Sequence, residues 1–88
     1  MATFRPTKAA QGDIQSIARY TEKSWGREQP DRYLLGMNDK ISDLSQTPTI
    51  ATELVDIVPP VRIYRYEKHL IVYLAKAGGI LVVRVLHQ

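Results

Sequence analysis

The feature that most restricts the fold of this 88-residue chain is its C-terminal third, Val61 to Gln88. Three short runs rich in Val, Ile, Leu and Tyr lie there, separated by Glu67-Lys68 and by the segment from Ala75 to Gly79. Short apolar runs with polar or glycine-containing connections are typical of antiparallel strands joined by tight turns. The sequence therefore predicts a three-stranded antiparallel meander whose apolar face must be covered by the rest of the chain.

The N-terminal segment predicts a short edge strand followed by a helix. Residues Ala2 to Pro6 can pair at a sheet edge, because proline lacks the amide hydrogen that continued pairing would need. Thr7 then suits the N-cap of a helix from Lys8 to about Trp25, in which apolar residues recur at spacings of three and four. Gly26 suits the position just after that helix.

A second amphipathic helix is predicted to start within Arg27 to Asp31 and to stop at Ser45 to Pro48, where the residue before a proline avoids the helical region. Its apolar stripe is predicted to consist of Tyr33, Met37, Ile41 and Leu44, supplemented by Leu34. Because the link is short, the two helices predict an antiparallel hairpin that packs on the sheet. The expected architecture is α+β, with a short N-terminal strand, a two-helix antiparallel hairpin and a C-terminal three-stranded antiparallel sheet. It forms a single domain over residues 1–88.

The segment Thr49 to Pro60 has no clear period but is too apolar to lie wholly in water, so we expect a loop packed on the core. The absence of cysteine excludes disulfides and thiolate metal sites. The N-terminus lacks the apolar region of a signal peptide, and no run is long enough to span a bilayer. We expect a cytoplasmic protein with no membrane segment; its formal charge of +3 does not by itself indicate a nucleic-acid partner.

Antiparallel pairing decides which side chains of the meander share a face. A two-residue connection at Glu67-Lys68 pairs Tyr66 with His69 and fixes the register along both strands. We expect the more apolar face to meet the helices. One face then holds Arg62, Tyr64, Tyr66, His69, Ile71 and Tyr73, and the apolar one holds Val61, Ile63, Leu70, Val72 and Leu74, with Arg65 as an exception.

The register of the last strand depends on the connection before it, since a one-residue change turns every side chain to the opposite face. A connection of Ala75 to Gly78 places Arg84 on the face of Arg62 and His69, and we favour this register. Leu81, Val83 and Val85 then join the apolar face. The alternative places Arg84 beneath the helices, where an unpaired cation is costly.

The polar face admits two interpretations. Arg62, His69, Tyr73 and Arg84 resemble the equipment of a metal-independent nuclease, in which histidine moves a proton and arginine stabilises a phosphate. Tyrosine and arginine are also common on strands simply because their long stems cover apolar surface. Neither histidine has a carboxylate at ligand spacing, so we expect no metal and no cofactor.

A series of motifs extends over nearly the whole chain. They are Tyr20-Thr21 with Trp25-Gly26, then Tyr33 and Ile41, Arg62-x-Tyr64-Arg65, His69-x-Ile71-x-Tyr73 and the run from Ile80 to Gln88. In this order they resemble ParE toxins of the RelE/ParE superfamily of bacterial toxin–antitoxin systems, which are often labelled plasmid stabilisation proteins. The most specific parts are the Tyr-Thr and Trp-Gly pairs and the terminal Arg-Val-Leu-His-Gln.

The resemblance implies a small toxin that inhibits DNA gyrase, blocks replication and is neutralised by a ParD-like antitoxin, through which alone it contacts operator DNA. It implies a binding protein rather than an enzyme. RelE relatives instead cleave messenger RNA at the ribosome with basic residues and a tyrosine or histidine on the sheet. A ribosome-dependent endoribonuclease that uses Arg62, His69, Tyr73 and Arg84 is therefore the alternative.

The segment Thr52 to Asp56 is acidic where RelE enzymes carry lysines, which removes cations that would hold RNA and favours the gyrase inhibitor. Many ParE sequences continue beyond the equivalent of Gln88 with a basic tail, and its absence predicts weaker toxicity. We expect the antitoxin to lie across the helix hairpin and the sheet margin, and gyrase to contact the sheet face and the C-terminal strand. The candidate partner-binding residues are Trp25, Tyr33, Arg62, Arg65, His69, Arg84 and His87.

Overall fold

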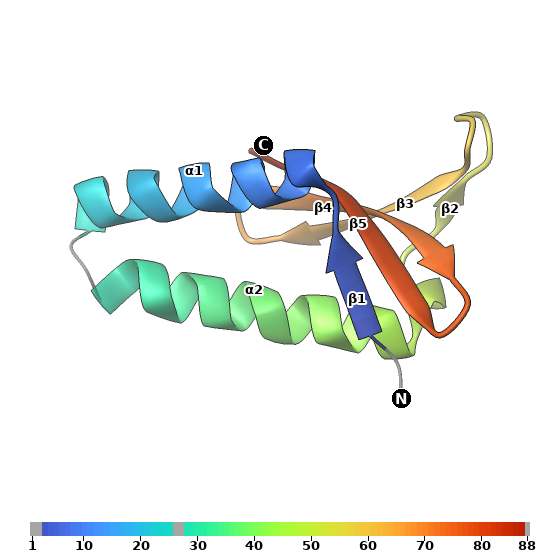
Figure 1. Cartoon of the computed structure of the whole chain (residues 1–88), viewed down its shortest axis with the longest axis horizontal. Helices are drawn as coiled ribbons and strands as arrows, with labels where there is room; N and C mark the ends of the chain where they lie inside the picture. The colour runs from blue at the N-terminus through green and yellow to red at the C-terminus, as the bar shows by residue number, and fades with distance from the viewer. Residues whose placement is uncertain (1–2, 26–27, 88) are drawn as a thin grey trace.

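Two helices and a five-stranded sheet form two layers in the computed structural model (Figure 1). The structure describes residues 3–25 and 28–87; for those of them that fall within 21–31 it describes the backbone alone. The strand order is β1-β5-β4-β3-β2. The predicted α+β architecture is confirmed, and a short strand at each edge extends the meander. The elements are β1 (Thr3–Pro6), α1 (Lys8–Trp25), α2 (Glu28–Gln46), the 3-10 helix η1 (Pro48–Ile50), β2 (Glu53–Leu54), β3 (Val61–Tyr66), β4 (His69–Lys76) and β5 (Gly79–His87).

Thr7 caps α1 as predicted. Its Oγ1 accepts a hydrogen bond from the Ala10 amide at 3.1 Å and donates one to the Val83 carbonyl at 2.7 Å. The Thr7 amide also donates to the Val82 carbonyl at 2.9 Å. Thr7 thus provides hydrogen-bond partners both for a backbone amide in the first turn of α1 and for backbone carbonyls of β5 at the point where β1 ends. Gly26, the expected residue after α1, lies outside the described residues.

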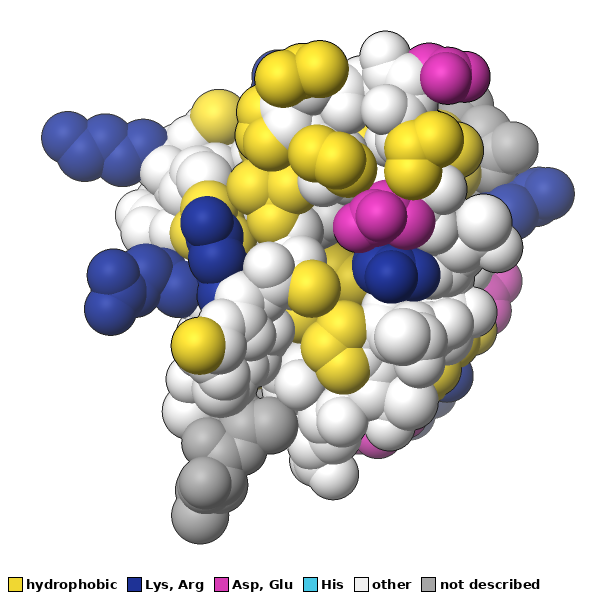
Figure 2. Space-filling model, turned by 90° about the vertical axis from the view of Figure 1, so that its right-hand side faces the viewer, with side chains coloured by type: hydrophobic (Ala, Val, Ile, Leu, Met, Phe, Trp, Pro, Cys, Tyr) yellow, Lys and Arg dark blue, Asp and Glu magenta, His cyan; other side chains and the backbone are white. Residues whose placement is uncertain are grey.

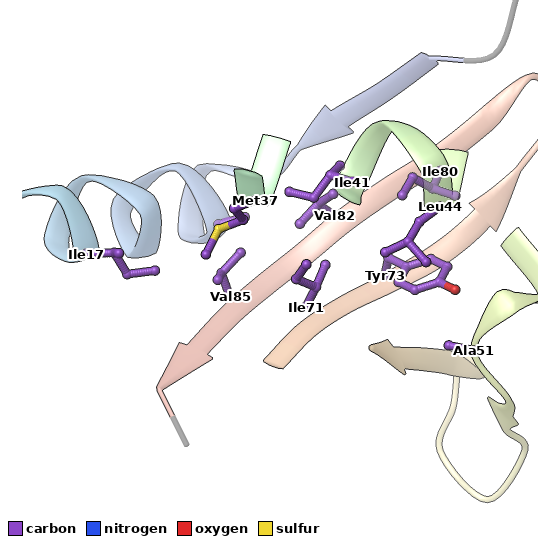
Figure 3. Packing of buried hydrophobic residues seen from close by; sticks show 11 residues of the cluster. Ile17, Met37, Ile41, Leu44, Ala51, Ile71, Tyr73, Ile80, Val82 and Val85 are labelled. Carbon is purple, nitrogen blue, oxygen red and sulfur yellow. The ribbon is translucent and has the colours of Figure 1, made fainter. Parts of the chain in front are cut away.

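The core lies between the helices and one face of the sheet. The predicted stripe of α2 supplies Met37, Ile41 and Leu44, whose side chains point toward those of β4 and β5 (Figure 3). Ala10 and Ile17 of α1 belong to the same buried cluster. The remaining buried apolar residues are Ala51, Ile71, Tyr73, Ile80, Val82 and Val85.

The register of β3 and β4 is as predicted, but the side that meets the helices is the opposite one. Tyr66 pairs with His69 and Arg62 with Tyr73. Ile71 and Tyr73 are fully buried under the helices, whereas Ile63 on the other face is 36% exposed. The expectation that the more apolar face packs on the helices is therefore wrong. The outer face carries Val61, Ile63, Arg65, Leu70, Val72, Leu74, Leu81 and Leu86.

Hydrogen bonds explain why tyrosine and histidine are on the buried side. The Tyr73 hydroxyl donates to the Pro48 carbonyl at 2.7 Å, and the Tyr66 hydroxyl donates to the Tyr33 carbonyl at 3.4 Å. A buried tyrosine contributes a large apolar area, and its hydroxyl costs little once it has a partner. Lys40 lies over the ring of Tyr64, with 5.4 Å from Nζ to the ring centroid. Partners on α2 and η1 thus decide the orientation of the sheet.

The turn before β5 is shorter than expected, and the favoured register is wrong. Ala77 and Gly78 form a two-residue turn, so that Lys76 pairs with Gly79 and Tyr73 with Val82. A bulge opposite Val72 and Tyr73 then shifts the register by one residue. Arg84 consequently pairs with Val72 of the outer face, not with the face of Arg62 and His69. Val85 packs in the core, and Leu81 lies on the outer face.

The N-terminal strand β1 runs parallel to β5 and pairs with its first half, from Thr3 opposite Gly79 to Pro6 opposite Val82. The Thr3 amide donates to the Gly78 carbonyl at 2.9 Å. A side chain at position 79 would place its Cβ 1.7 Å from the Thr3 carbonyl oxygen. Only glycine therefore permits this close approach of the first and last strands.

The prediction that the loop between β2 and β3 packs on the core is wrong. Ala51 is buried, but the apolar side chains that follow it are in solvent, with exposed fractions of 38% for Leu54, 69% for Val55, 45% for Ile57 and 92% for Val58. In Figure 1 this loop projects from the sheet at the end away from the C-terminal end of α1. Figure 2 faces that end of the molecule, where hydrophobic side chains gather at the surface.

Candidate functional site

His69 stands at the start of β4, beside His87 of β5 and close to Tyr33 of α2. Its Nδ1 lies 2.7 Å from the Tyr33 hydroxyl oxygen, and its ring meets that of His87 edge to face at 5.0 Å between centroids. Burial lowers the pKa of the His69 imidazole, and the neighbouring His87 lowers it further. Burial also raises the pKa of Tyr33. The pair is therefore uncharged at neutral pH and joined by a short hydrogen bond.

A mainly apolar pocket of 320 Å³ opens beside the two histidines and is lined by Ser16, Ile17, Tyr20, His69 and His87. Among the described side chains, those of residues 3–20 and 32–87, no three of histidine, aspartate or glutamate are arranged to hold a metal ion. The pocket could accept an apolar side chain. It lacks the cations that would hold a phosphate.

Arg62 and Tyr73 lie at the other end of the β3–β4 pair and hold the segment between α2 and β3. Arg62 Nη1 donates to the Ala51 carbonyl, and Nη2 is 4.0 Å from Glu53 Oε2. Tyr73 reaches the Pro48 carbonyl, and burial raises the pKa of its hydroxyl. Arg62 Nε is buried with no hydrogen-bond partner among the described residues. Both side chains therefore anchor η1 and β2.

Arg84 forms a two-pronged ion pair with Asp13 of α1. Its Nε and Nη2 donate to the two carboxylate oxygens at 2.8 and 2.9 Å, and the Val85 amide donates to Asp13 Oδ2 at 2.9 Å. The hydrogen bond from Arg84 lowers the pKa of Asp13, although burial opposes this. The same pairing raises the pKa of Arg84. This arrangement joins the second half of β5 to α1.

The four residues of the possible nuclease set are thus not brought together. His69 and Tyr73 are four residues apart on β4, which corresponds to about 13 Å along an extended strand. Arg62 is directed to the backbone of Ala51, and Arg84 is directed to Asp13. The face that Arg62, His69 and Tyr73 share is covered by helices rather than open, because it forms the buried side of the sheet.

Of the other predicted partner-binding residues, Arg65 is exposed on the outer face and donates through Nε to the Glu67 carbonyl at 3.3 Å. His87 is exposed beside His69, and Tyr33 is half-buried. The side chain of Trp25 lies outside the described residues. Tyr33, His69 and His87 form one cluster, whereas Arg62, Arg65 and Arg84 are dispersed around the sheet.

Two apolar surfaces were not identified by sequence reasoning. The first is a groove of 480 Å³ between α1, α2 and β1, lined by Phe4, Ile14, Leu34, Leu35, Met37, Asn38 and Ile41. Leu35 lies outside the predicted stripe and is 65% exposed, which is the signal that could have revealed the groove. The second is the exposed loop after β2, whose acidic residues among Val and Ile argued against core packing.

Comparison with known proteins agrees with this architecture. The model of one family, described as "ParE toxin of type II toxin-antitoxin system, parDE", matches residues 4–88. A curated protein of Escherichia coli, "Toxin ParE", is 32% identical over 89 residues, an alignment that covers 100% of this chain and 86% of that protein. A solved structure titled "Chromosomal ParDE TA system from P. aeruginosa" superposes with a TM-score of 0.81 at 19% identity. It covers 99% of this chain and 96% of the other, which shows a shared fold.

Fold and relatives together define a toxin of the RelE/ParE superfamily. The chain belongs to the ParE toxin family of type II toxin–antitoxin systems. No helix in the described part of the chain is long and apolar enough to cross a membrane.

Proposed function

We propose that this ParE toxin inhibits DNA gyrase by binding it, catalyses no reaction of its own, and thereby blocks replication. Membership of the ParE family supports the target. One observation supports binding without catalysis: the side chains that could act as catalytic groups are already hydrogen-bonded within the protein. Arg62 bonds to Ala51, Arg84 to Asp13 and His69 to Tyr33. A catalytic arginine must instead reach the phosphate that it stabilises.

A ParD-like antitoxin neutralises the toxin, and operator DNA is contacted only through that antitoxin. The groove between α1, α2 and β1 supports this part of the proposal, because it is apolar, open and bordered by the exposed Leu35. An amphipathic segment of the antitoxin that fills it would lie across the helix hairpin and the adjoining sheet margin. The toxin then acts in the cytoplasm, where gyrase and the antitoxin are found.

The test is a supercoiling assay in which purified toxin is titrated against gyrase. We expect the toxin to abolish supercoiling, and its cognate antitoxin to restore it. Untouched supercoiling at high toxin excess, together with no DNA damage after expression, would refute the proposal. Sequencing of messenger RNA 5′ ends after expression tests the ribosome-dependent endoribonuclease, because only that activity produces cleavage within codons at the ribosome.

A further inference from the structure

We propose that the loop Glu53 to Val58, here named the docking loop, is the part of the toxin that contacts gyrase, by inserting into an apolar pocket with a cationic rim. The inference rests on the proposed function, since it takes gyrase as the target. It assigns the contact to a segment that is neither the sheet face nor the C-terminal strand.

The apolar content of the docking loop is the first observation. Val55 and Val58 are 69% and 92% exposed, and Leu54 and Ile57 are also in solvent. Apolar side chains that gather at one exposed place, rather than singly, are typical of interaction sites. The docking loop lies in the end-on view of the molecule in which Figure 2 shows a hydrophobic cluster.

The rigid base of the docking loop is the second observation. Arg62 bonds to the Ala51 carbonyl and lies near Glu53, and Tyr73 bonds to the Pro48 carbonyl. Pairing of Glu53 with Arg62 and of Leu54 with Val61 fixes the strand from which the loop starts. A loop held at its base loses less conformational entropy when it binds than a mobile one. Arg62 and Tyr73 therefore act as positioning residues.

The place and the charge of the docking loop decide between the two protein partners. The groove assigned to the antitoxin adjoins β1, whereas the docking loop begins at β2, on the opposite edge of the sheet. The loop carries no cation, and its carboxylates are Asp56 and, 4.0 Å from Arg62, Glu53. An enzyme that handles DNA must present Lys and Arg to neutralise phosphates, so gyrase offers the cationic surface that this loop fits.

The experiment compares Val55→Ser/Val58→Ser with Leu86→Ser, whose side chain is 38% exposed on the outer face of the sheet, in the supercoiling assay. We expect the double variant to need at least about tenfold more toxin for half-inhibition, as for loss of a hot-spot contact, and Leu86→Ser to match the wild type. Circular dichroism, thermal unfolding and antitoxin binding should be unchanged in both variants, because the replaced side chains are exposed.

A second comparison isolates charge. Asp56→Lys should weaken inhibition several-fold more than Asp56→Asn, and the difference should shrink as salt is raised. If wild-type toxin inhibits gyrase and the double variant inhibits it equally well, the docking loop is not the contact and only this inference fails. If the wild type itself leaves supercoiling untouched, the proposed function fails as well.

Discussion

Arg84 and Asp13 join the last strand to the first helix through two parallel hydrogen bonds of 2.8 and 2.9 Å. The same carboxylate accepts the Val85 amide, and Thr7 bonds to the neighbouring Val82 and Val83 carbonyls. Where β1 ends, the backbone groups at the edge of β5 thus form hydrogen bonds with Thr7 and Asp13, at the start of α1. Sheet and helix are one hydrogen-bonded unit at this point.

Asp13→Asn should lower the free energy of unfolding by about 1–2 kcal/mol, because the ion pair with Arg84 is lost and the new amide nitrogen must face at least one donor of Arg84 or Val85. Since the hydrogen bond from Arg84 lowers the pKa of Asp13 from its ordinary 3.8, the contribution is present at neutral pH. It is lost as pH falls below about 4 toward the lowered pKa. Urea titrations at several pH values measure both effects. Asp39→Asn, on the exposed side of α2, is the control and should change stability little.

His69→Gln should flatten the fall in stability on mild acidification. Burial lowers the pKa of His69 below 6.5, so the unfolded chain takes up a proton before the folded protein does. Stability is therefore full above about pH 6.5 and decreases as pH falls below it. Thermal unfolding across this range should show a smaller decrease in the variant. In the control His87→Gln, which changes the exposed neighbour, most of the decrease should persist; loss of the decrease there would contradict the assignment to His69.

The two glycines Gly79 and Gly12 should respond in opposite ways to alanine. Gly79→Ala forces a Cβ against the Thr3 carbonyl and should destabilise the protein by about 3 kcal/mol or more, with loss of the β1–β5 pairing. A Cβ added at Gly12, inside α1, would meet no described neighbour within 4 Å, so Gly12→Ala should stabilise by up to about 1 kcal/mol. Hydrogen exchange of the Thr3 amide reports on the pairing. Equal effects of the two substitutions would contradict this packing.

Leu35→Ser should weaken antitoxin binding by about tenfold and leave gyrase inhibition unchanged, because Leu35 borders the groove that adjoins β1, whereas the docking loop starts at β2 on the opposite sheet edge. Calorimetry with the cognate antitoxin measures the change. Leu86→Ser removes an exposed apolar side chain from the outer face of the sheet and serves as the control. Unchanged antitoxin binding by Leu35→Ser would place the antitoxin elsewhere.

Local signals in the sequence were sufficient to predict the two helices, the strands of the meander and the register between β3 and β4. Thr7 is followed by a clear helical period, and the Glu67-Lys68 turn leaves a single pairing of β3 with β4. The side of the sheet that is buried could not be inferred, because alternation gives two faces without saying which has partners. Here the Pro48 carbonyl and the Tyr33 side chain, both distant in sequence, make Tyr73 and His69 suitable for burial.

The site was harder to predict for the same reason. An arginine on a strand looks available for catalysis until its partner is known, and Asp13 lies 71 residues before Arg84. The exposure of Val55 and Val58 was not predicted, because apolar residues are normally buried; the sequence signal against burial is Asp56 between them.

The parallel pairing of β1 with β5 has a consequence for the timing of synthesis. A ribosome makes β1 first and β5 last, so β1, Thr7 and Asp13 lack their partners on β5 until that strand emerges. The nascent chain therefore cannot hold the native sheet, and the toxin becomes competent only after most of its translation is complete. An antitoxin already present in the cell can then bind the toxin as soon as it folds.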